Sequence, residues 1–365
     1  MRLLFLSTHG EPCGIATYTE ALESALSAQG CEVNVLSPHR IDDGRDEARG
    51  TSRLWSRDGA TMAEAAHTVA LLRKLRPDVV HIQHNLGLYS ARFLAAVHAG
   101  CRRYRIALTT TLHGRAGGSA IRRARLRRHL LALGISSVVV HNEAHRRELP
   151  LPRRTTVIPH GVFPPEPADL TEAKRALGID PADPVLAHFG FLHPHKGVRE
   201  VLEVVSRLQS KGRRLHYLIC GGAADDGISR DYLAQLREGA SHAEMSEHIR
   251  VDGRFLDDEE LMARLRAADW IVLNYRAGGD QGTSGAARHA LRAGRPLAIS
   301  TAPIFDDMRS AAHTLKGPLD NAVAELLDDA GLAGRTLQRA RRYCERHGWD
   351  VIATRHLTHY GRIKR

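Results

Sequence analysis

Short apolar runs alternate with amphipathic stretches along most of the chain. The apolar runs predict buried strands at residues 2–7, 31–36, 79–83, 107–112, 137–141, 156–158, 185–189, 215–220, 270–273 and 296–300. Apolar residues at helical spacing predict helices at residues 16–28, 198–209, 258–267, 284–293 and 349–363. Strands that alternate with helices are typical of parallel sheets covered on both faces, so we predict an α/β protein.

This alternation starts twice, first at residue 2 and again at residues 185–189. Between them, residues 163–184 hold five prolines and show weak periodicity, and we place a domain linker at the start of this segment. A chain of 365 residues is also long enough for two domains. We therefore expect two doubly wound domains that bind ligands beyond the carboxyl ends of their strands, in a cleft between two such edges.

The composition, 43% hydrophobic and 25% charged, is that of an ordinary globular protein. There is no apolar run of about 18 residues to span a membrane, and the apolar run at residues 3–6 is too short for a secretory signal. The five cysteines are scattered and none has C-x-x-C spacing. We expect reduced thiols in a cytoplasmic protein, without disulfides or a zinc site.

The formal net charge of +11 favours anionic partners such as nucleotides, phospholipid surfaces or nucleic acid. Aromatic residues make up only 5% of the chain, and no stretch interleaves them with basic residues as a stacking groove would. We therefore predict no nucleic-acid partner. Binding to a polynucleotide with steep salt dependence would favour that weaker alternative.

The segment 280–296 carries the strongest chemical signal, because small and hydroxyl-bearing residues open a predicted helix there. The unpaired N–H groups and the positive dipole end of such a helix form a seat for an anion. Thr283 and Ser284 add hydroxyl groups, while Gly282 and Gly285 let a phosphate approach the backbone. A plain helix cap followed by a core helix explains the same residues equally well.

The segment 189–197 follows a predicted strand and precedes a predicted helix. It begins with Gly190, contains His193, and ends with Lys196 and a glycine. A lysine at this place can reach a diphosphate as a point charge. The alternative is a surface lysine in a turn, which the glycine on each side disfavours.

Two further residues of interest lie in the first half of the chain. Gly14 opens the first predicted helix, so a phosphate could also dock there, although many such turns contain glycine. His113 follows the strand at residues 107–112 and could hydrogen-bond a bound sugar or carry a proton.

Histidine pairs at His141 and His145, and at His193 and His195, have spacings that zinc can use. No cysteine or carboxylate cluster completes either pair, so we predict no metal site.

A basic helix is predicted near residues 119–131, with an apolar stripe at Ile121, Leu126 and Leu130. Helices of this kind lie on anionic membranes, but a solvated basic face over a core stripe fits as well. The arginines assigned to contact with an acceptor or a membrane are Arg122, Arg123, Arg127 and Arg128.

Together these motifs resemble the GT4-type glycosyltransferases, which have the GT-B fold. The resemblance covers nearly the whole chain and rests on residues 13–18, 112–114, 157–162, 189–197, 282–296 and 349–363. It implies an acceptor-side Rossmann-like domain at residues 1–163 and a nucleotide-sugar domain at residues 164–345. It also implies a C-terminal helix, residues 346–365, that crosses back to the first domain.

The resemblance implies transfer of a sugar, with retention, from a nucleotide-diphosphate sugar such as a UDP- or GDP-sugar, without a metal or another cofactor. It implies that Lys196 and the helix after Gly282 stabilise the leaving diphosphate, while Gln281 and His113 orient the sugar. The family usually has two glutamates where this chain has Gln281 and His289; the first would contact the donor sugar and the second the ribose. Where relatives often have an arginine before the lysine, this chain has His193, a pH-dependent phosphate partner.

These replacements leave two alternatives open beside transfer. The chain could be an inactive GT-B protein that binds a sugar nucleotide, or a nucleotide-sugar epimerase. For transfer, the expected acceptor is a glycan, a glycolipid or a cell-surface polysaccharide precursor. The basic helix adds the hypothesis of peripheral contact with anionic lipid at the inner face of the membrane.

Overall fold

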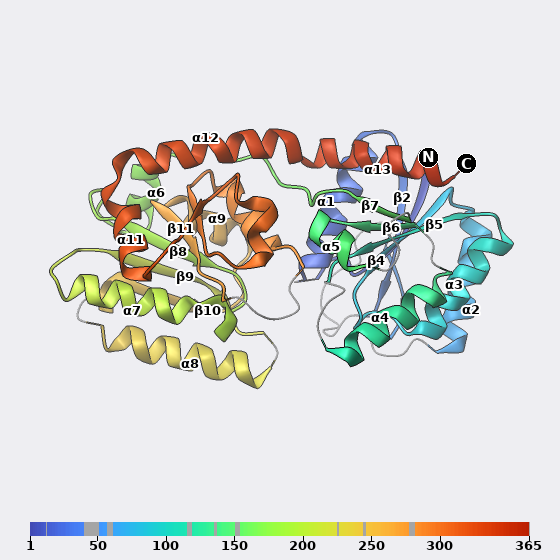
Figure 1. The fold of residues 1–365 in the computed structure, drawn as a ribbon, viewed down its shortest axis with the longest axis horizontal. Helices are drawn as coiled ribbons and strands as arrows, with labels where there is room; N and C mark the ends of the chain where they lie inside the picture. Colours follow the sequence, from blue (N-terminus) through green and yellow to red (C-terminus); the bar gives the residue numbers. More distant parts are fainter. Residues whose placement is uncertain are drawn as a thin grey trace. The chain divides into compact units, whose positions relative to one another are not determined.

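The computed structural model describes residues 1–11, 13–39, 51–56, 61–114, 119–134, 137–149, 154–224, 226–243, 246–276 and 282–364. The chain divides into two compact units. Unit 1 comprises Met1–Gly161, Gly279–Thr283 and His347–Arg365, and unit 2 comprises Val162–Gly278 and Ser284–Arg346. Each unit contains one parallel sheet flanked by helices, which confirms the predicted fold class (Figure 1).

The sheet of unit 1 has the strand order β3-β2-β1-β4-β5-β6-β7 and is parallel throughout. This is the classic order of a doubly wound nucleotide-binding sheet with one further strand. Its strands are β1 (Arg2–Leu6), β2 (Glu32–Pro38), β3 (Thr51–Trp55), β4 (Val79–His84), β5 (Ala107–Leu112), β6 (Ser137–Val140) and β7 (Thr155–Val157). Its helices are α1 (Gly14–Ala28), α2 (Met62–Leu75), α3 (Ala91–Arg103), α4 (Ala120–Ala132), α5 (Glu143–Glu148) and α13 (Trp349–Ile363).

The two faces of this sheet bury different side chains. Leu4, Val80 and Ile82 point to the face covered by α2 and α3, where they form an apolar core. On the other face, His81 donates to or accepts from the hydroxyls of Tyr360 on α13 and Thr111 on β5, each at 2.7 Å. Because side chains alternate along a strand, one strand serves both an apolar and a polar face.

Unit 2 has the strand order β10-β9-β8-β11-β12-β13, also parallel. Its strands are β8 (Val185–Phe189), β9 (His216–Gly222), β10 (Ile249–Gly253), β11 (Trp270–Leu273), β12 (Leu297–Ile299) and β13 (His313–Thr314). Its helices are α6 (Leu170–Ala176), α7 (Val198–Gln209), α8 (Gly227–Ser241), α9 (Asp258–Arg266), α10 (Gly285–Ala290), α11 (Leu319–Asp328) and α12 (Ala330–His347), with 3-10 turns at Pro194–Lys196, Ser246–His248, Leu291–Ala293 and Pro303–Met308.

Apolar cores cover both faces of the second sheet. Ala187 and Ile271 pack with residues of α9, α10 and α12, whereas Leu186 and Val272 pack with residues of α7, α8 and α11. The strands are therefore buried on both sides, which is why they appear in the sequence as continuous apolar runs.

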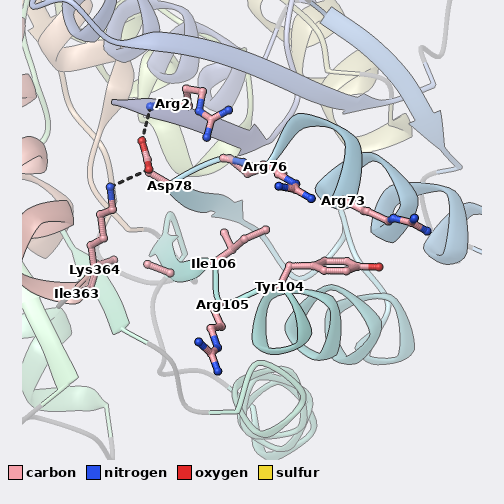
Figure 2. Close-up of a pocket in the computed structure, with 11 residues that line it drawn as sticks. Arg2, Arg73, Arg76, Asp78, Tyr104, Arg105, Ile106, Ile363 and Lys364 are labelled. Carbon is pink, nitrogen blue, oxygen red and sulfur yellow. Dashed lines mark hydrogen bonds and ion pairs between the residues drawn. The ribbon is translucent and has the colours of Figure 1, made fainter.

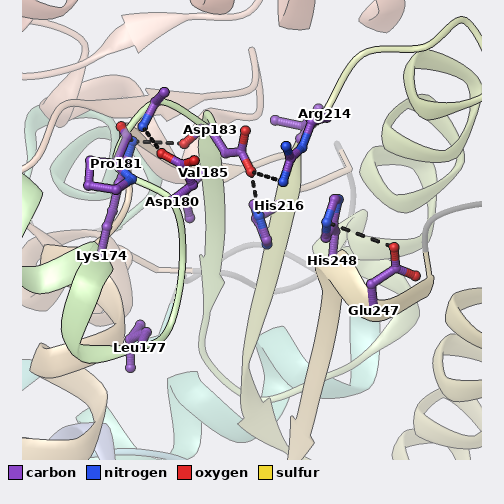
Figure 3. A network of polar contacts seen from close by, with 12 residues as sticks. Lys174, Leu177, Asp180, Pro181, Asp183, Val185, Arg214, His216, Glu247 and His248 are labelled. Carbon is purple, nitrogen blue, oxygen red and sulfur yellow. Dashed lines mark hydrogen bonds and ion pairs between the residues drawn. The ribbon is translucent and has the colours of Figure 1, made fainter.

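The amino-terminal edge of this sheet is held by buried polar contacts (Figure 3). Lys174 on α6 places its Nζ 2.7 Å from a carboxylate oxygen of Asp269 and donates to the carbonyl of Asp183 at 2.9 Å. The Asp183 carboxylate in turn lies 3.1 Å from Arg214 and 3.4 Å from His216. Burial, followed by the neighbouring His248, lowers the pKa of His216 despite that carboxylate. Removing the Asp269 carboxylate would leave the buried ammonium group of Lys174 without an ion-pair partner, so this pair secures α6 to its sheet.

Candidate functional site

The turn after β8 is built on two glycines that adopt backbone conformations unfavourable for other residues. Gly190 has φ 121° and Gly197 has φ 65°. A Cβ at Gly197 would lie 1.9 Å from the carbonyl oxygen of Asn274. Backbone hydrogen bonds from Gly190 and Leu192 to the end of β9 hold the rest of the turn. Its shape is therefore fixed before any ligand binds.

Lys196 ends the 3-10 helix of this turn, and its Nζ lies 3.9 Å from the centroid of the Tyr275 ring. A cation over an aromatic face is attracted by the ring, so Tyr275 fixes the position of the ammonium group. The backbone N–H of Arg276 donates to the carbonyl of His195 at 2.8 Å and ties the turn to the chain after β11. The predicted lysine is thus held in place at the carboxyl edge of the unit 2 sheet.

The hydroxyl of Tyr275 is buried and has no hydrogen-bond partner among the residues that the structure describes. It lies 3.8 Å from the place where a Cβ of Gly190 would be, and the Cβ of Ala286 lies 3.6 Å from the same place. The β8 turn and the start of α10 therefore meet beside this hydroxyl. An unpaired buried hydroxyl costs about 1–3 kcal/mol, which a ligand oxygen could recover. Tyr275 was not predicted, although its position just beyond the carboxyl end of a predicted strand was a signal for it.

Ser284 is the N-cap of α10, and its Oγ accepts a hydrogen bond from the N–H of Ala287 at 3.1 Å. The helix itself spans only six residues and continues as a 3-10 turn. A Cβ at Gly285 would meet nothing within 4 Å, so there is open space for a ligand to approach the first turn. Ser284 therefore caps the helix, while the first turn at Gly285 stays open to a ligand.

The rest of this segment groups with unit 1. Gly282 and Thr283 belong there, and a Cβ at Gly282 would lie 2.3 Å from the carbonyl oxygen of His113. Gln281, which the resemblance assigns to the donor sugar, lies outside the described residues.

Three histidines near the proposed donor site, His193, His195 and His289, are engaged with neighbouring side chains. The Nδ1 atoms of His193 and His195 are 2.7 Å apart, so one ring donates to the other. Burial, and then the charge of Lys196, lowers the pKa of His195 to about 4. His289 lies 2.9 Å from a carboxylate oxygen of Asp258, and burial lowers its pKa despite that partner. The lowered pKa values of His195 and His289 leave Lys196 as the cationic side chain on which the proposed site depends.

His113 stands at the carboxyl end of β5 in unit 1, and its Nε2 is 2.8 Å from the amide oxygen of Gln83. Because that oxygen can only accept, Nε2 carries the proton. Burial, and then the nearby His160, lowers the pKa of His113 to about 3. A base so weak is poorly matched to proton abstraction near pH 7, so the geometry favours a hydrogen-bonding role.

The ring of Tyr18 on α1 packs against four other rings in this part of unit 1. Its ring centroid lies 4.8 Å from that of His113, 4.9 Å from His160, 5.3 Å from His141 and 5.1 Å from Trp349. These rings come from four separate segments, and sequence reasoning singled out only His113 among them for sugar binding. Gly14 opens α1, and a Cβ there would meet nothing within 4 Å. The glycine leaves space but is not required by its backbone conformation.

The four arginines predicted on the basic helix do not share one environment. A Cβ at Gly114 would lie 2.9 Å from an Nη atom of Arg122. The guanidinium group of this half-buried arginine therefore lies close to the backbone of the residue that follows His113. Arg123, Arg127 and Arg128 are exposed.

The predicted apolar stripe of α4 was wrong at Ile121, which is 83% exposed, whereas Leu126 and Leu130 are buried. Five positions turn an α-helix by about 140° beyond a full turn, so Ile121 cannot share the face of Leu126.

Within the described residues, no three histidine, cysteine, aspartate or glutamate side chains are arranged to hold a metal ion. Both histidine pairs considered for zinc lack a third ligand there. Among the described residues, no helix is both long enough and apolar enough to cross a membrane.

Two family models match consecutive parts of the chain. Glycosyltransferase Family 4 matches residues 12–164, and Glycosyl transferases group 1 matches residues 169–331. No curated protein matches the chain significantly.

Several solved structures share the fold over almost the whole chain. HepE from Anabaena in complex with UDP has a TM-score of 0.76 at 16% identity, covering 99% of this chain and 100% of its own. Sucrose-phosphate synthase from Thermosynechococcus elongatus has a TM-score of 0.74 at 18% identity, covering 100% and 99%. The UDP-forming α,α-trehalose-phosphate synthase from Burkholderia xenovorans, in complex with glucose-6-phosphate, has a TM-score of 0.74 at 15% identity, covering 99% and 100%. At these identities the likeness establishes the fold alone, and the family models establish the family. The chain belongs to the GT4-type family of glycosyltransferases and is an enzyme of that class.

Proposed function

We propose that this enzyme transfers a sugar, with retention and without a metal, from a UDP- or GDP-sugar to a glycan, a glycolipid or a cell-surface polysaccharide precursor. The observation that carries the proposal is the Lys196 ammonium, held over Tyr275 in a turn fixed by two glycines. HepE is described in complex with UDP and with UDP-glucose, and the Burkholderia synthase is described as UDP-forming. These relatives support a UDP-sugar as the first donor to test.

The proposed chemistry relies on charge that grows on the leaving diphosphate. Lys196 and the N–H groups at the start of α10 would stabilise this charge, and preorganised donors of this kind contribute about 3–4 kcal/mol each to the transition state. Because the ammonium group of Lys196 supplies the positive charge that stabilises the leaving diphosphate, this step needs no divalent cation. The neutral His113 and, from the resemblance, Gln281 would orient the sugar by hydrogen bonds to its hydroxyls.

The central test is a thermal-shift screen of the full chain against UDP-, GDP-, ADP- and dTDP-sugars, with and without EDTA. A ligand at 100 times its dissociation constant stabilises a protein by about 2.7 kcal/mol. We expect one donor class to raise the melting temperature equally in both buffers, and Lys196→Ala to abolish the shift. If no nucleotide sugar shifts the melting temperature, the proposed donor is wrong; a shift that requires metal would contradict metal independence.

Product analysis tests the reaction itself. With donor and acceptor, NMR of the new anomeric centre should show the configuration of the donor. An isomerised donor formed without acceptor would favour the epimerase alternative. Tight binding without any turnover would contradict transfer and favour the inactive binding protein.

The acceptor proposal includes a cytoplasmic location and contact of α4 with anionic lipid at the inner face of the membrane. The exposed side of α4 carries Ile121 and Leu131, which are 83% and 67% exposed, together with Arg127 and Arg128. Apolar side chains beside cationic ones are typical of helices that lie on anionic lipid. The double variant Arg127→Glu/Arg128→Glu should lose binding to phosphatidylglycerol vesicles. Arg342→Glu/Arg346→Glu, two exposed arginines on α12, is the matched control and should retain it; equal binding by both variants would end this part of the proposal.

A further inference from the structure

A cavity of about 660 Å³ lies at the amino-terminal edge of the unit 1 sheet. Arg2 begins β1, Asp78 precedes β4, and residues 105–107 lead into β5. Ile363 and Lys364 at the end of α13 complete this wall (Figure 2). His113, at the carboxyl end of β5, stands at the other edge of the same sheet. We call this cavity the arginine pocket; all of its lining residues belong to unit 1.

The arginine pocket has a large excess of positive charge. Its lining includes five cations, Arg2, Arg73, Arg76, Arg105 and Lys364, but only one carboxylate, that of Asp78. This carboxylate is already engaged, because Lys364 Nζ lies 2.7 Å from one oxygen and the backbone N–H of Arg2 donates to the other at 2.8 Å. These bonds, with Lys364 first, hold the pKa of Asp78 below its ordinary value. None of the four guanidinium groups forms an ion pair with a described carboxylate.

The backbone at two of these arginines is unusual. Arg76 and Arg105 have φ of 44° and 56°, and they are the two non-glycine residues with positive φ in the described chain. Each follows a helix of the unit 1 sheet, α2 and α3. After α1, α6 and α7 the residue with the same backbone hydrogen bonds as Arg105 is a glycine, Gly30, Gly178 or Gly212, which suits this conformation.

The conformation at Arg105 is required by the way α3 ends. The N–H of Arg105 donates to the carbonyl of Arg102, and the N–H of Ile106 donates to that of Cys101 at 2.8 Å. Such a pair of hydrogen bonds forms at the end of a helix when the residue after it adopts left-handed backbone dihedrals. A side chain with a Cβ is disfavoured in that conformation. Arginine therefore occupies two positions at which glycine would relieve strain, and both positions line one cavity.

The chemistry of the pocket selects the class of ligand. Guanidinium groups bind phosphate with two parallel hydrogen bonds, and several around one cavity suit an anion with more than one charge. Ile106 lies between Arg76 and Arg105, with the ring of Tyr104 beside it (Figure 2). A cavity of this volume falls within the range of small-molecule sites.

We propose that the arginine pocket binds a phosphate-bearing group, either of a soluble phosphate compound or of a phospholipid headgroup, at a site separate from that of the sugar donor. This inference does not depend on the proposed donor reaction, because no residue of the pocket takes part in that reaction.

The test uses the full chain with Lys196→Ala, so that pyrophosphate binding at the proposed donor turn is removed. Calorimetric titration with inorganic pyrophosphate is compared between this chain and one that also carries Arg76→Gly and Arg105→Gly. Loss of two guanidinium contacts should weaken binding by about tenfold or more. The melting temperature should stay the same or rise, because glycine suits both backbone positions. A loss caused by misfolding would instead lower the melting temperature.

A second arm distinguishes the two sources of phosphate. Flotation with phosphatidylcholine vesicles, with and without phosphatidic acid, is measured in the Arg127→Glu/Arg128→Glu background to remove binding by α4. Binding to phosphatidic acid without binding to pyrophosphate, lost with the glycine variants, would support a headgroup; the reverse would support a soluble compound. The proposal is overturned if neither probe binds, or if the glycine variants bind both as well as their parent.

Discussion

The carboxyl edges of the two sheets carry different chemistry. In unit 2 the edge holds a fixed ammonium group, that of Lys196 over Tyr275, on a turn whose glycines have positive φ. In unit 1 the edge holds the neutral imidazole of His113, bonded to Gln83 and packed against Tyr18. A charged, preorganised turn suits an anion, whereas neutral hydrogen-bonding groups suit hydroxyls. We therefore expect one fold, used twice, to recognise charge in one unit and neutral polar groups in the other.

Removing the charge from the unit 2 edge should have the largest effect on activity. We expect Lys196→Ala to lower turnover about 100-fold or more, since one preorganised electrostatic contact is worth about that much. The fold should be intact, because Lys196 is half-buried and its ammonium group has no described carboxylate partner. Steady-state kinetics with circular dichroism provide the check. A wild-type rate would remove Lys196 from the mechanism and end the contrast between the two edges.

Substituting one glycine in each unit should sharpen the same contrast. Gly197→Ala should lower the free energy of unfolding by about 1–3 kcal/mol, because the new Cβ would collide with the carbonyl of Asn274 at a positive φ. Gly14→Ala is the matched control in unit 1, where a Cβ meets nothing, and should change it by less than about 0.5 kcal/mol. Urea unfolding measures both, and equal effects would show that the unit 2 turn is not the more rigid one.

His113→Ala should lower kcat/KM about tenfold, the value of one lost hydrogen bond. Because the pKa of His113 is lowered to about 3, the imidazole is neutral throughout pH 6–8 and contributes no titration there. The pH–rate profile should therefore keep its shape in the variant. Gln83→Ala, which removes the partner amide, should mimic the loss. If the variant instead lost a limb of the profile near neutral pH, His113 would be a proton carrier after all.

The last test concerns the pH dependence of the stability of unit 1. His356 on α13 is 3.1 Å from the hydroxyl of Tyr18, and burial lowers its pKa to about 3. Since an unfolded histidine has a pKa near 6.5, the unfolded chain binds a proton between these values that the folded chain does not. The contribution of the neutral His356 to the free energy of unfolding is fully present above pH 6.5 and is lost as the pH falls towards 3. Melting temperatures should fall across this range, and His356→Gln should flatten part of the slope. An unchanged slope would exclude His356 as a source.

Most strands that the sequence predicted are interior strands of their sheets, with both faces covered, although the predicted β7 (Thr155–Val157) lies at an edge. The strands β5 (Ala107–Leu112), β8 (Val185–Phe189) and β11 (Trp270–Leu273) have the predicted bounds. The strands that were missed, β3, β10 and β13, lie at the edges of their sheets. Edge strands need only one covered flank and are short or polar, so they carry a weak apolar signal.

Other omissions had a readable local cause. Helix α2 begins with a capping box between Thr61 and Glu64, in which each residue bonds the backbone of the other. This pair of residues is visible in the sequence and predicts the start of a helix. The helix was missed because the prediction relied on the spacing of apolar residues alone.

The sequence by itself determined the two parallel sheets, the glycine turn that carries Lys196, and the strand end that carries His113. These depend on the order of apolar runs and on the backbone freedom of glycine, both of which are local properties of the chain. Only the tertiary structure decided that Tyr275 supports Lys196, that Arg122 turns towards Gly114, and that five cations line one pocket at the far end of the unit 1 sheet. Such contacts join residues distant in sequence, and no local pattern records which segments the packing of strands and helices will bring together.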